Sequence, residues 1–77
     1  MLDKIAELIR DYIGNDDIEI TRDTDLMMDL GIASIDVLNL VADFEDYFEV
    51  KVDDKAISGF ITVGDINDYI EDLLNTK

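Results

Sequence analysis

The chain has 77 residues, which is enough for one small domain with its own hydrophobic core. Twenty acidic residues against six basic ones give a formal net charge of −14. This charge argues against nucleic acids and anionic membrane surfaces as partners and favours proteins with basic patches. Because the sequence has no cysteine and no histidine, disulfides, thiolate metal sites and the usual general base are all missing, and we expect no enzyme.

The chain enters an amphipathic pattern at its second residue. Apolar residues at Leu2, Ile5 and Ile9 begin a helical repeat that predicts a helix over residues 2–13, ended by Gly14. No charged segment precedes an apolar run here, and no apolar run approaches the length of a membrane span. We therefore expect a cytoplasmic protein without membrane insertion.

Residues 16–33 show no strong periodicity and predict a long ordered loop, a kind of segment that is usually functional. Taking Asp17 or Asp23 as the first ligand of a calcium-binding loop leaves no glycine at the sixth position and no glutamate at the twelfth. We therefore expect no metal site. Apolar residues of the loop should pin it to the core: Ile18, Ile20, Leu26, Met27 and Leu30.

A second helix is predicted over residues 35–49. The face of this helix that points away from the core is predicted to carry only polar residues. Between that face and the core-facing stripe lies a flank of three apolar residues, Ile35, Leu38 and Ala42. The predicted core stripe of this helix is Val37, Leu40, Val41, Phe44 and Phe48.

A short helix is predicted over residues 54–58, capped by Asp53 and ended by Gly59. The next two residues, Phe60 and Ile61, are expected in the core.

Thr62, with Asp65 three residues on, marks the start of the last helix in a pattern close to a capping box. Three main helices and one short helix, with a long loop between the first two and no credible strand, predict an all-α four-helix bundle. The whole chain, residues 1–77, is expected to form this single domain. The last helix should bury Val63, Ile66, Ile70 and Leu73.

One serine, Ser34, lies where the long loop meets the second helix, and its residue type supports two interpretations. A serine at a helix start is most often an N-cap that satisfies backbone amides. Alternatively, Ser34 is a covalent attachment point, since a phosphate ester there would be stabilised by the helix amides and the macrodipole. Gly31 nearby removes a side chain and would let a modifying enzyme approach closely.

Residues 23–50 contain eight acidic residues and no lysine or arginine. Most charge runs are solvated helix faces, but such a face normally mixes signs to gain from ion pairs. Charge of one sign beside Ile35 and Leu38 favours a docking surface, in which acids steer a basic partner and small apolar residues make contact.

The segment Asp29-Leu30-Gly31, followed after two residues by Ser34-Ile35-Asp36, resembles the phosphopantetheine attachment motif of the acyl carrier protein family. The resemblance covers essentially the whole chain and implies a four-helix bundle. It also implies that a phosphopantetheinyl transferase, using coenzyme A and Mg²⁺, attaches 4′-phosphopantetheine to the Ser34 hydroxyl. The thiol of this group would carry acyl groups as thioesters between enzymes of fatty acid, polyketide or related biosynthesis, and the chain would be a stand-alone, monomeric carrier.

The resemblance also assigns residues to two surfaces. Positions that meet basic residues of partner enzymes, or dock beside them, are Ile35, Asp36, Leu38, Glu45 and Asp46. Positions that line a cavity for the acyl chain are Leu40, Phe44, Val52, Ile57 and Phe60, and the bulk of Phe44 and Ile57 predicts a small or closed pocket. The sequence departs from the family at Ala33, where an acid is usual, and at Asn39, which is often acidic.

Two classes of function therefore stand side by side. The chain is either a carrier modified at Ser34 or an unmodified acidic helical adaptor, in which Ser34 is only a helix cap. An enzyme ranks last, because no base accompanies Ser34 to activate its hydroxyl.

Overall fold

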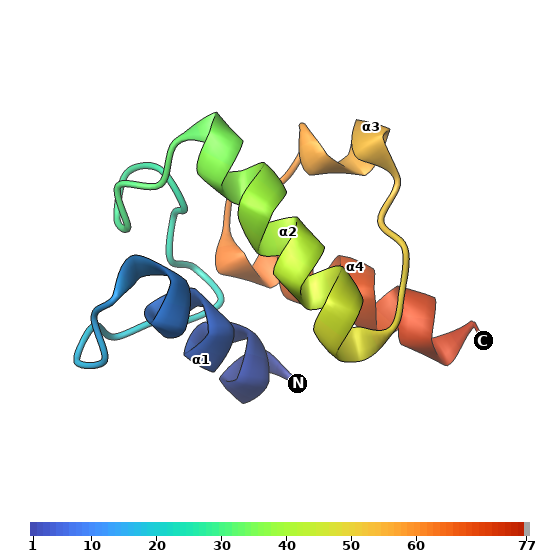
Figure 1. Ribbon diagram of the computed structural model, residues 1–77, viewed down its shortest axis with the longest axis horizontal. Coiled ribbons are helices and arrows are strands. Elements are labelled where there is room, and N and C mark those ends of the chain that lie inside the picture. The colour runs from blue at the N-terminus through green and yellow to red at the C-terminus, as the bar shows by residue number, and fades with distance from the viewer. Residues whose placement is uncertain (77) are drawn as a thin grey trace.

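The computed structural model describes residues 1–76 and has four helices, shown in Figure 1: α1 (Leu2–Ile13), α2 (Ser34–Phe48), α3 (Asp54–Ile57) and α4 (Val63–Asn75). The expected all-α fold, with a long loop between the first two helices, is confirmed. The last residue of the expected domain, Lys77, lies outside the described residues. Within residues 1–76, no helix has both the length and the apolar character needed to cross a membrane.

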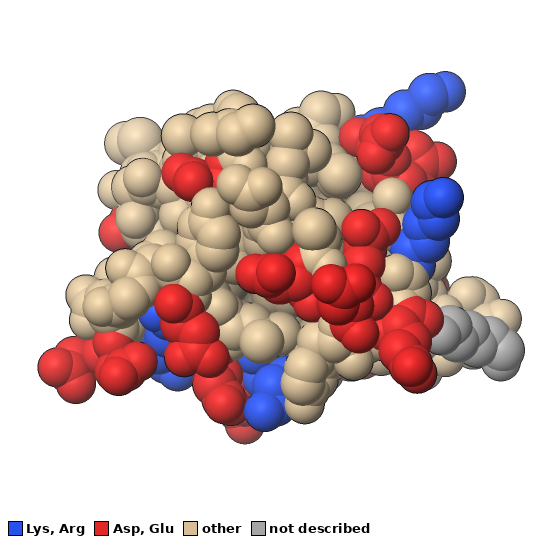
Figure 2. All heavy atoms as spheres, in the orientation of Figure 1, with Lys and Arg blue, Asp and Glu red and all other residues tan. Residues whose placement is uncertain are grey.

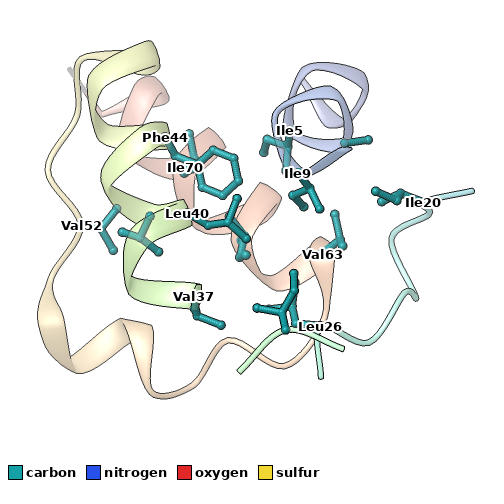
Figure 3. Packing of buried hydrophobic residues seen from close by; sticks show 14 residues of the cluster. Ile5, Ile9, Ile20, Leu26, Val37, Leu40, Phe44, Val52, Val63 and Ile70 are labelled. Atoms are coloured by element: carbon teal, nitrogen blue, oxygen red, sulfur yellow. The ribbon is translucent and has the colours of Figure 1, made fainter. Parts of the chain in front are cut away.

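Three long helices share one core. In Figure 3, side chains from α1, α2 and α4 point into the space between these helices, and the loop contributes Ile20 and Leu26 at its edge. Because most of these side chains are fully buried, their apolar surface supplies the main stabilising term of a domain this small. The fully buried side chains of greatest volume are Phe44, Ile5, Ile9, Leu26, Leu40, Ile66, Ile70 and Val63.

The helix ends follow the capping residues of the sequence. Gly14 takes a left-handed conformation, with φ of 71°, and its N–H donates to the Arg10 carbonyl at 2.9 Å, which closes α1. The Asp53 carboxylate accepts the Lys55 N–H at 2.8 Å at the start of α3, as expected.

The expected capping box at the start of α4 is confirmed. The Thr62 hydroxyl accepts the Asp65 N–H at 3.2 Å, while Asp65 Oδ2 accepts the Thr62 and Ile61 N–H groups at 3.0 Å each. These backbone donors, that of Thr62 foremost, hold the pKa of the Asp65 carboxyl below its usual value because they stabilise the ionised form.

The long loop is fastened to the connection between α3 and α4. The Leu26 N–H donates to the Ile61 carbonyl at 3.0 Å, and the Val63 N–H donates to the Thr24 carbonyl at 3.0 Å. Between these bonds lies an isolated antiparallel bridge that joins residue 25 to residue 62. Segments 35 to 39 residues apart in the sequence therefore lie side by side next to the start of α2.

A second attachment of the loop lies in the first two turns of α4. The Gly64 N–H donates to the Arg22 carbonyl at 2.9 Å, so the loop backbone rests directly on the helix. The Arg22 guanidinium also pairs with both carboxylate oxygens of Asp68, at 2.9 and 2.6 Å. This pairing holds the pKa of the Asp68 carboxyl below its usual value.

Two expected core residues are instead exposed. Met27 is 54% exposed and Ile61 is 61% exposed, so the prediction that they pack inside is wrong. The pairing of Leu26 with the 60–62 connection explains both corrections, since Leu26 and the half-buried Phe60 face inward and their successors point away.

Candidate functional site

Ser34 is the first residue of α2, and its neighbour Ala33 occupies the N-cap position, with φ of −82° and ψ of 167°. Ser34 is exposed, and its hydroxyl makes no hydrogen bond to any group in residues 1–76. The serine is therefore not the helix cap that one interpretation of the sequence required. Its hydroxyl faces solvent without a competing intramolecular partner.

Asp36 supplies the side-chain cap at this helix start. Its Oδ2 accepts the Ala33 N–H at 3.0 Å, which is the reciprocal half of a capping box. The Asp36 and Val37 N–H groups both donate to the Ala33 carbonyl, at 2.9 and 3.1 Å. The N–H groups of Ser34 and Ile35 have no acceptor in the described part of the chain, so two donors stay open where the helix dipole favours negative charge.

The turn before Ser34 needs glycine at position 31 because of its backbone conformation and not because a side chain would collide with a neighbour. Gly31 has φ of 67°, which a side chain rarely tolerates, yet a Cβ there would meet nothing within 4 Å. Its N–H donates to the Met27 carbonyl at 3.1 Å, and this bond closes the turn that delivers the chain to α2. The surface above Gly31 is open, as close approach by another protein would need.

Two carboxylates of the loop, those of Asp25 and Asp29, hold its last turn together. Asp29 Oδ2 accepts the Asp25 N–H at 2.8 Å, and Asp25 Oδ1 accepts the Met27 and Met28 N–H groups at 3.0 and 2.8 Å. Asp29, the first residue of the motif recognised in the sequence, thus shapes the turn that presents Met27 and Met28. Among the described residues, no group of three or more carboxylates is placed to hold a metal ion.

A mostly apolar cleft of about 560 Å³ opens beside Ser34. Two of the acyl-pocket candidates, Ile57 and Phe60, line it. The other three candidates lie in the core: Leu40 and Phe44 are fully buried and Val52 is buried. The remaining walls come from the loop, α2, α3 and the connection before α4: Asp25, Leu26, Met27, Met28, Val37, Leu38, Asp54, Ser58 and Ile61.

Sequence reasoning assigned no functional role to three exposed apolar residues of this cleft: Met27, Met28 and Ile61. Met28 is 85% exposed, the highest value among the large apolar side chains of the described chain. The available signal was the Met27-Met28 pair itself, two large apolar residues between aspartates in a loop without helical periodicity.

The expected docking residues fall into two groups. Ile35 and Leu38 are 63% and 49% exposed beside Ser34, and Asp46 is exposed further along α2. The carboxylates of Asp36 and Glu45 instead make internal bonds, Asp36 to Ala33 and Tyr12, and Glu45 to the Val52 N–H at 2.8 Å. Figure 2 shows acidic side chains gathered over the C-terminal half of α2, while the surface above its N-terminal half is mainly uncharged.

The model of the phosphopantetheine attachment site family matches residues 3–70 of this chain. The chain belongs to the acyl carrier protein family. An acyl carrier protein from Thermotoga maritima is 44% identical over 68 residues, which are 88% of this chain and 84% of the relative. One from Clostridium perfringens is 37% identical over 70 residues, which are 91% and 92% of the two chains.

Solved structures agree with the family assignment. A crystal structure of an acyl carrier protein from Thermotoga maritima matches with a TM-score of 0.86 and 31% identity, over 97% of this chain and 87% of the other. Family membership implies a covalently attached 4′-phosphopantetheine as the cofactor, a carrier role and contact with acyl-processing enzymes. The residues at the start of α2 fit this group, since an unbonded hydroxyl, two open amide donors and an apolar cleft lie together.

Proposed function

We propose that Ser34 is the attachment point of 4′-phosphopantetheine and that residues 1–77 form one carrier domain that itself catalyses no reaction. The state of the Ser34 hydroxyl carries this proposal: it is exposed, accepts and donates no hydrogen bond within the described chain, and begins a helix. A serine used as a cap would have its oxygen engaged by a backbone amide. The adaptor alternative, which needed Ser34 as a cap, is not favoured.

The bound group supplies a thiol at the end of a flexible arm, where acyl groups are carried as thioesters. The chain's own residues support its phosphate. The open N–H groups of Ser34 and Ile35 and the dipole of α2 favour a phosphate diester at this position. Since no base accompanies Ser34, the transferase must supply both the base and the coenzyme A.

The proposed docking surface consists of Ile35, Leu38 and the acidic residues of α2. Partners with basic patches suit it, because the net charge of −14 steers them toward the carrier while the two exposed apolar residues make contact. Within this surface Asp46 is free for an ion pair, whereas Asp36 and Glu45 would have to exchange or share internal bonds. The monomeric state and the cytoplasmic location expected from the sequence stay predictions.

Intact mass spectrometry tests the attachment point. The protein is incubated with coenzyme A, Mg²⁺ and a promiscuous phosphopantetheinyl transferase, and the expected result is the addition of one phosphopantetheine. Ser34→Ala should fold normally by circular dichroism and gain nothing. The sequence holds one other serine, Ser58, which also lines the cleft, so Ser58→Ala is the matched control and should be modified like the wild type.

Two results would contradict the proposal. One is a wild-type protein that gains no mass with several transferases, and the other is a Ser34→Ala protein that is still modified.

A further inference from the structure

A chain of hydrogen bonds links α1 to the first turn of α2. Asn39 Nδ2 donates to the Tyr12 hydroxyl oxygen at 3.3 Å, and the Tyr12 hydroxyl donates to Asp36 Oδ1 at 2.9 Å. The other carboxylate oxygen, Oδ2, accepts the Ala33 N–H at 3.0 Å. The chain of bonds therefore ends on the residue directly before Ser34.

The direction of these bonds is fixed by the groups involved. An ionised carboxylate can only accept, so the single hydroxyl proton of Tyr12 goes to Asp36. The hydroxyl oxygen then needs a donor, which the Asn39 amide provides and a carboxylate at this position could not. The asparagine at position 39, where the family often has an acid, is therefore matched to the tyrosine at position 12.

This network compensates for a missing cap. Ala33, the N-cap residue, has no side-chain oxygen, and within the described chain the Asp36 carboxylate makes the only side-chain hydrogen bond to the backbone at this helix start. A carboxylate held through one oxygen can swing about its side-chain bonds. With Tyr12 on the second oxygen it is held at both ends, and the backbone on each side of Ser34 is held with it.

We propose that Tyr12 is a positioning residue for the modification of Ser34 and acts through Asp36. This inference rests on the proposed attachment at Ser34. Tyr12 makes no hydrogen bond to the serine; it fixes the turn from which the Ser34 hydroxyl must approach the phosphorus. In the transfer the Ser34 oxygen bonds to the phosphorus next to the pantetheine of coenzyme A, the pyrophosphate P–O bond breaks, adenosine 3′,5′-bisphosphate leaves, and a base of the transferase takes the serine proton. Loss of its hydroxyl slows the transfer step without altering Ile35, Leu38 or Asp46, through which the transferase would bind.

The test compares two tyrosine-to-phenylalanine variants in a transferase assay. Tyr12→Phe should lower kcat for phosphopantetheine transfer roughly three- to tenfold and leave KM within about twofold. Tyr69→Phe is the matched control, because the hydroxyl of this half-buried tyrosine is also hydrogen-bonded, accepting the Asp53 N–H at 3.2 Å, yet the residue lies on α4. It should keep both constants within about twofold of wild type.

Two further variants test the route through Asp36. In an Asp36→Ala background, Tyr12→Phe should have no additional effect on kcat, since the group through which it acts is gone. Asn39→Asp should lower kcat in the same way as Tyr12→Phe, because it removes the donor and adds a second negative charge. Independently of activity, the Ala33 amide proton should exchange faster in folded Tyr12→Phe than in wild type.

Several results would overturn the inference: an unchanged kcat in Tyr12→Phe, an equal loss in Tyr69→Phe, or an undiminished effect in the Asp36→Ala background. A rise in KM alone would also overturn it, since the hydroxyl would then affect binding of the transferase, either by direct contact or through the freed Asp36, and not the positioning of Ser34. A wild-type protein that is not modified at all would refute the attachment at Ser34 instead, so the two failures are distinguishable.

Discussion

Replacement of Gly64 by alanine measures how tightly the long loop is held against α4. Gly64 is buried in the first turn of the helix, and its N–H donates to the Arg22 carbonyl at 2.9 Å. A Cβ built on Gly64 would lie 2.9 Å from the same carbonyl oxygen and 3.3 Å from the Arg22 Cβ. The nearest atom belongs to the backbone and not to a flexible side chain, so the loop itself must move.

Two opposing effects decide whether Gly64→Ala raises or lowers the free energy of unfolding. Alanine favours a helix interior over glycine by about 1 kcal/mol, which on its own would stabilise the variant. Overpacking a close contact costs about 1 to 3 kcal/mol, and weakening the Gly64–Arg22 hydrogen bond costs about 1 kcal/mol more. We therefore expect the free energy of unfolding to fall by about 1 to 3 kcal/mol, which lowers the Tm of a domain this size by about 5 to 20 °C.

Thermal unfolding followed by far-UV circular dichroism checks this expectation at constant protein and salt concentration. Gly59→Ala is the control, since a Cβ at Gly59 makes only an ordinary contact, 3.5 Å from the Ala56 carbonyl oxygen. Its Tm should stay close to that of wild type. A Gly64→Ala protein that melts at or above the wild-type temperature would show that the loop is not tightly held on α4.

Two further predictions concern the capping box and the cleft. The folded-state pKa of Asp65 is lowered, so its contribution to stability is present above the unfolded value of about 4 and is lost as the pH falls through the folded value. The Tm difference between wild type and Asp65→Asn should therefore be largest near neutral pH and shrink below about pH 4; a difference independent of pH would refute this assignment. In a crystal structure of the octanoyl form, we expect the acyl chain to lie against Ile57 and Phe60 in the cleft; a chain buried between Leu40, Phe44 and Val52 in the core would contradict this expectation.

Periodic segments were predictable from sequence, and segments without a period were predictable only in part, since Ile20 and Leu26 are buried as expected while Met27 and Ile61 are not. The buried faces of α1, α2 and α4 could be predicted, because the helical repeat alone decides which side chains share a face. Met27 and Ile61 lie in extended or turn backbone, where the inward side is set by pairing between residues 24–26 and 61–63. No local sequence pattern predicts that pairing. Met27 and Ile61 were therefore expected in the core because they are apolar.

At the candidate site, too, local sequence patterns predicted some features, while others depend on the packing of distant segments. The spacing of Gly31, Ser34 and Asp36 located the start of α2 to within one residue. The bond from Tyr12 to Asp36 spans 24 positions between two helices, and only their packing brings the two side chains together. The sequence therefore pointed to Asp36 as an outward-facing acid and gave no sign that α1 already engages its carboxylate.

The dependence of the loop on residues 61–63 has a consequence for the newly made protein. During synthesis Ser34 leaves the ribosome well before the segment to which Thr24 and Leu26 are bonded. Until that segment follows, the nascent chain exposes the serine without the walls around it. The surface around Ser34 is therefore complete only once residues 61–63 have been made.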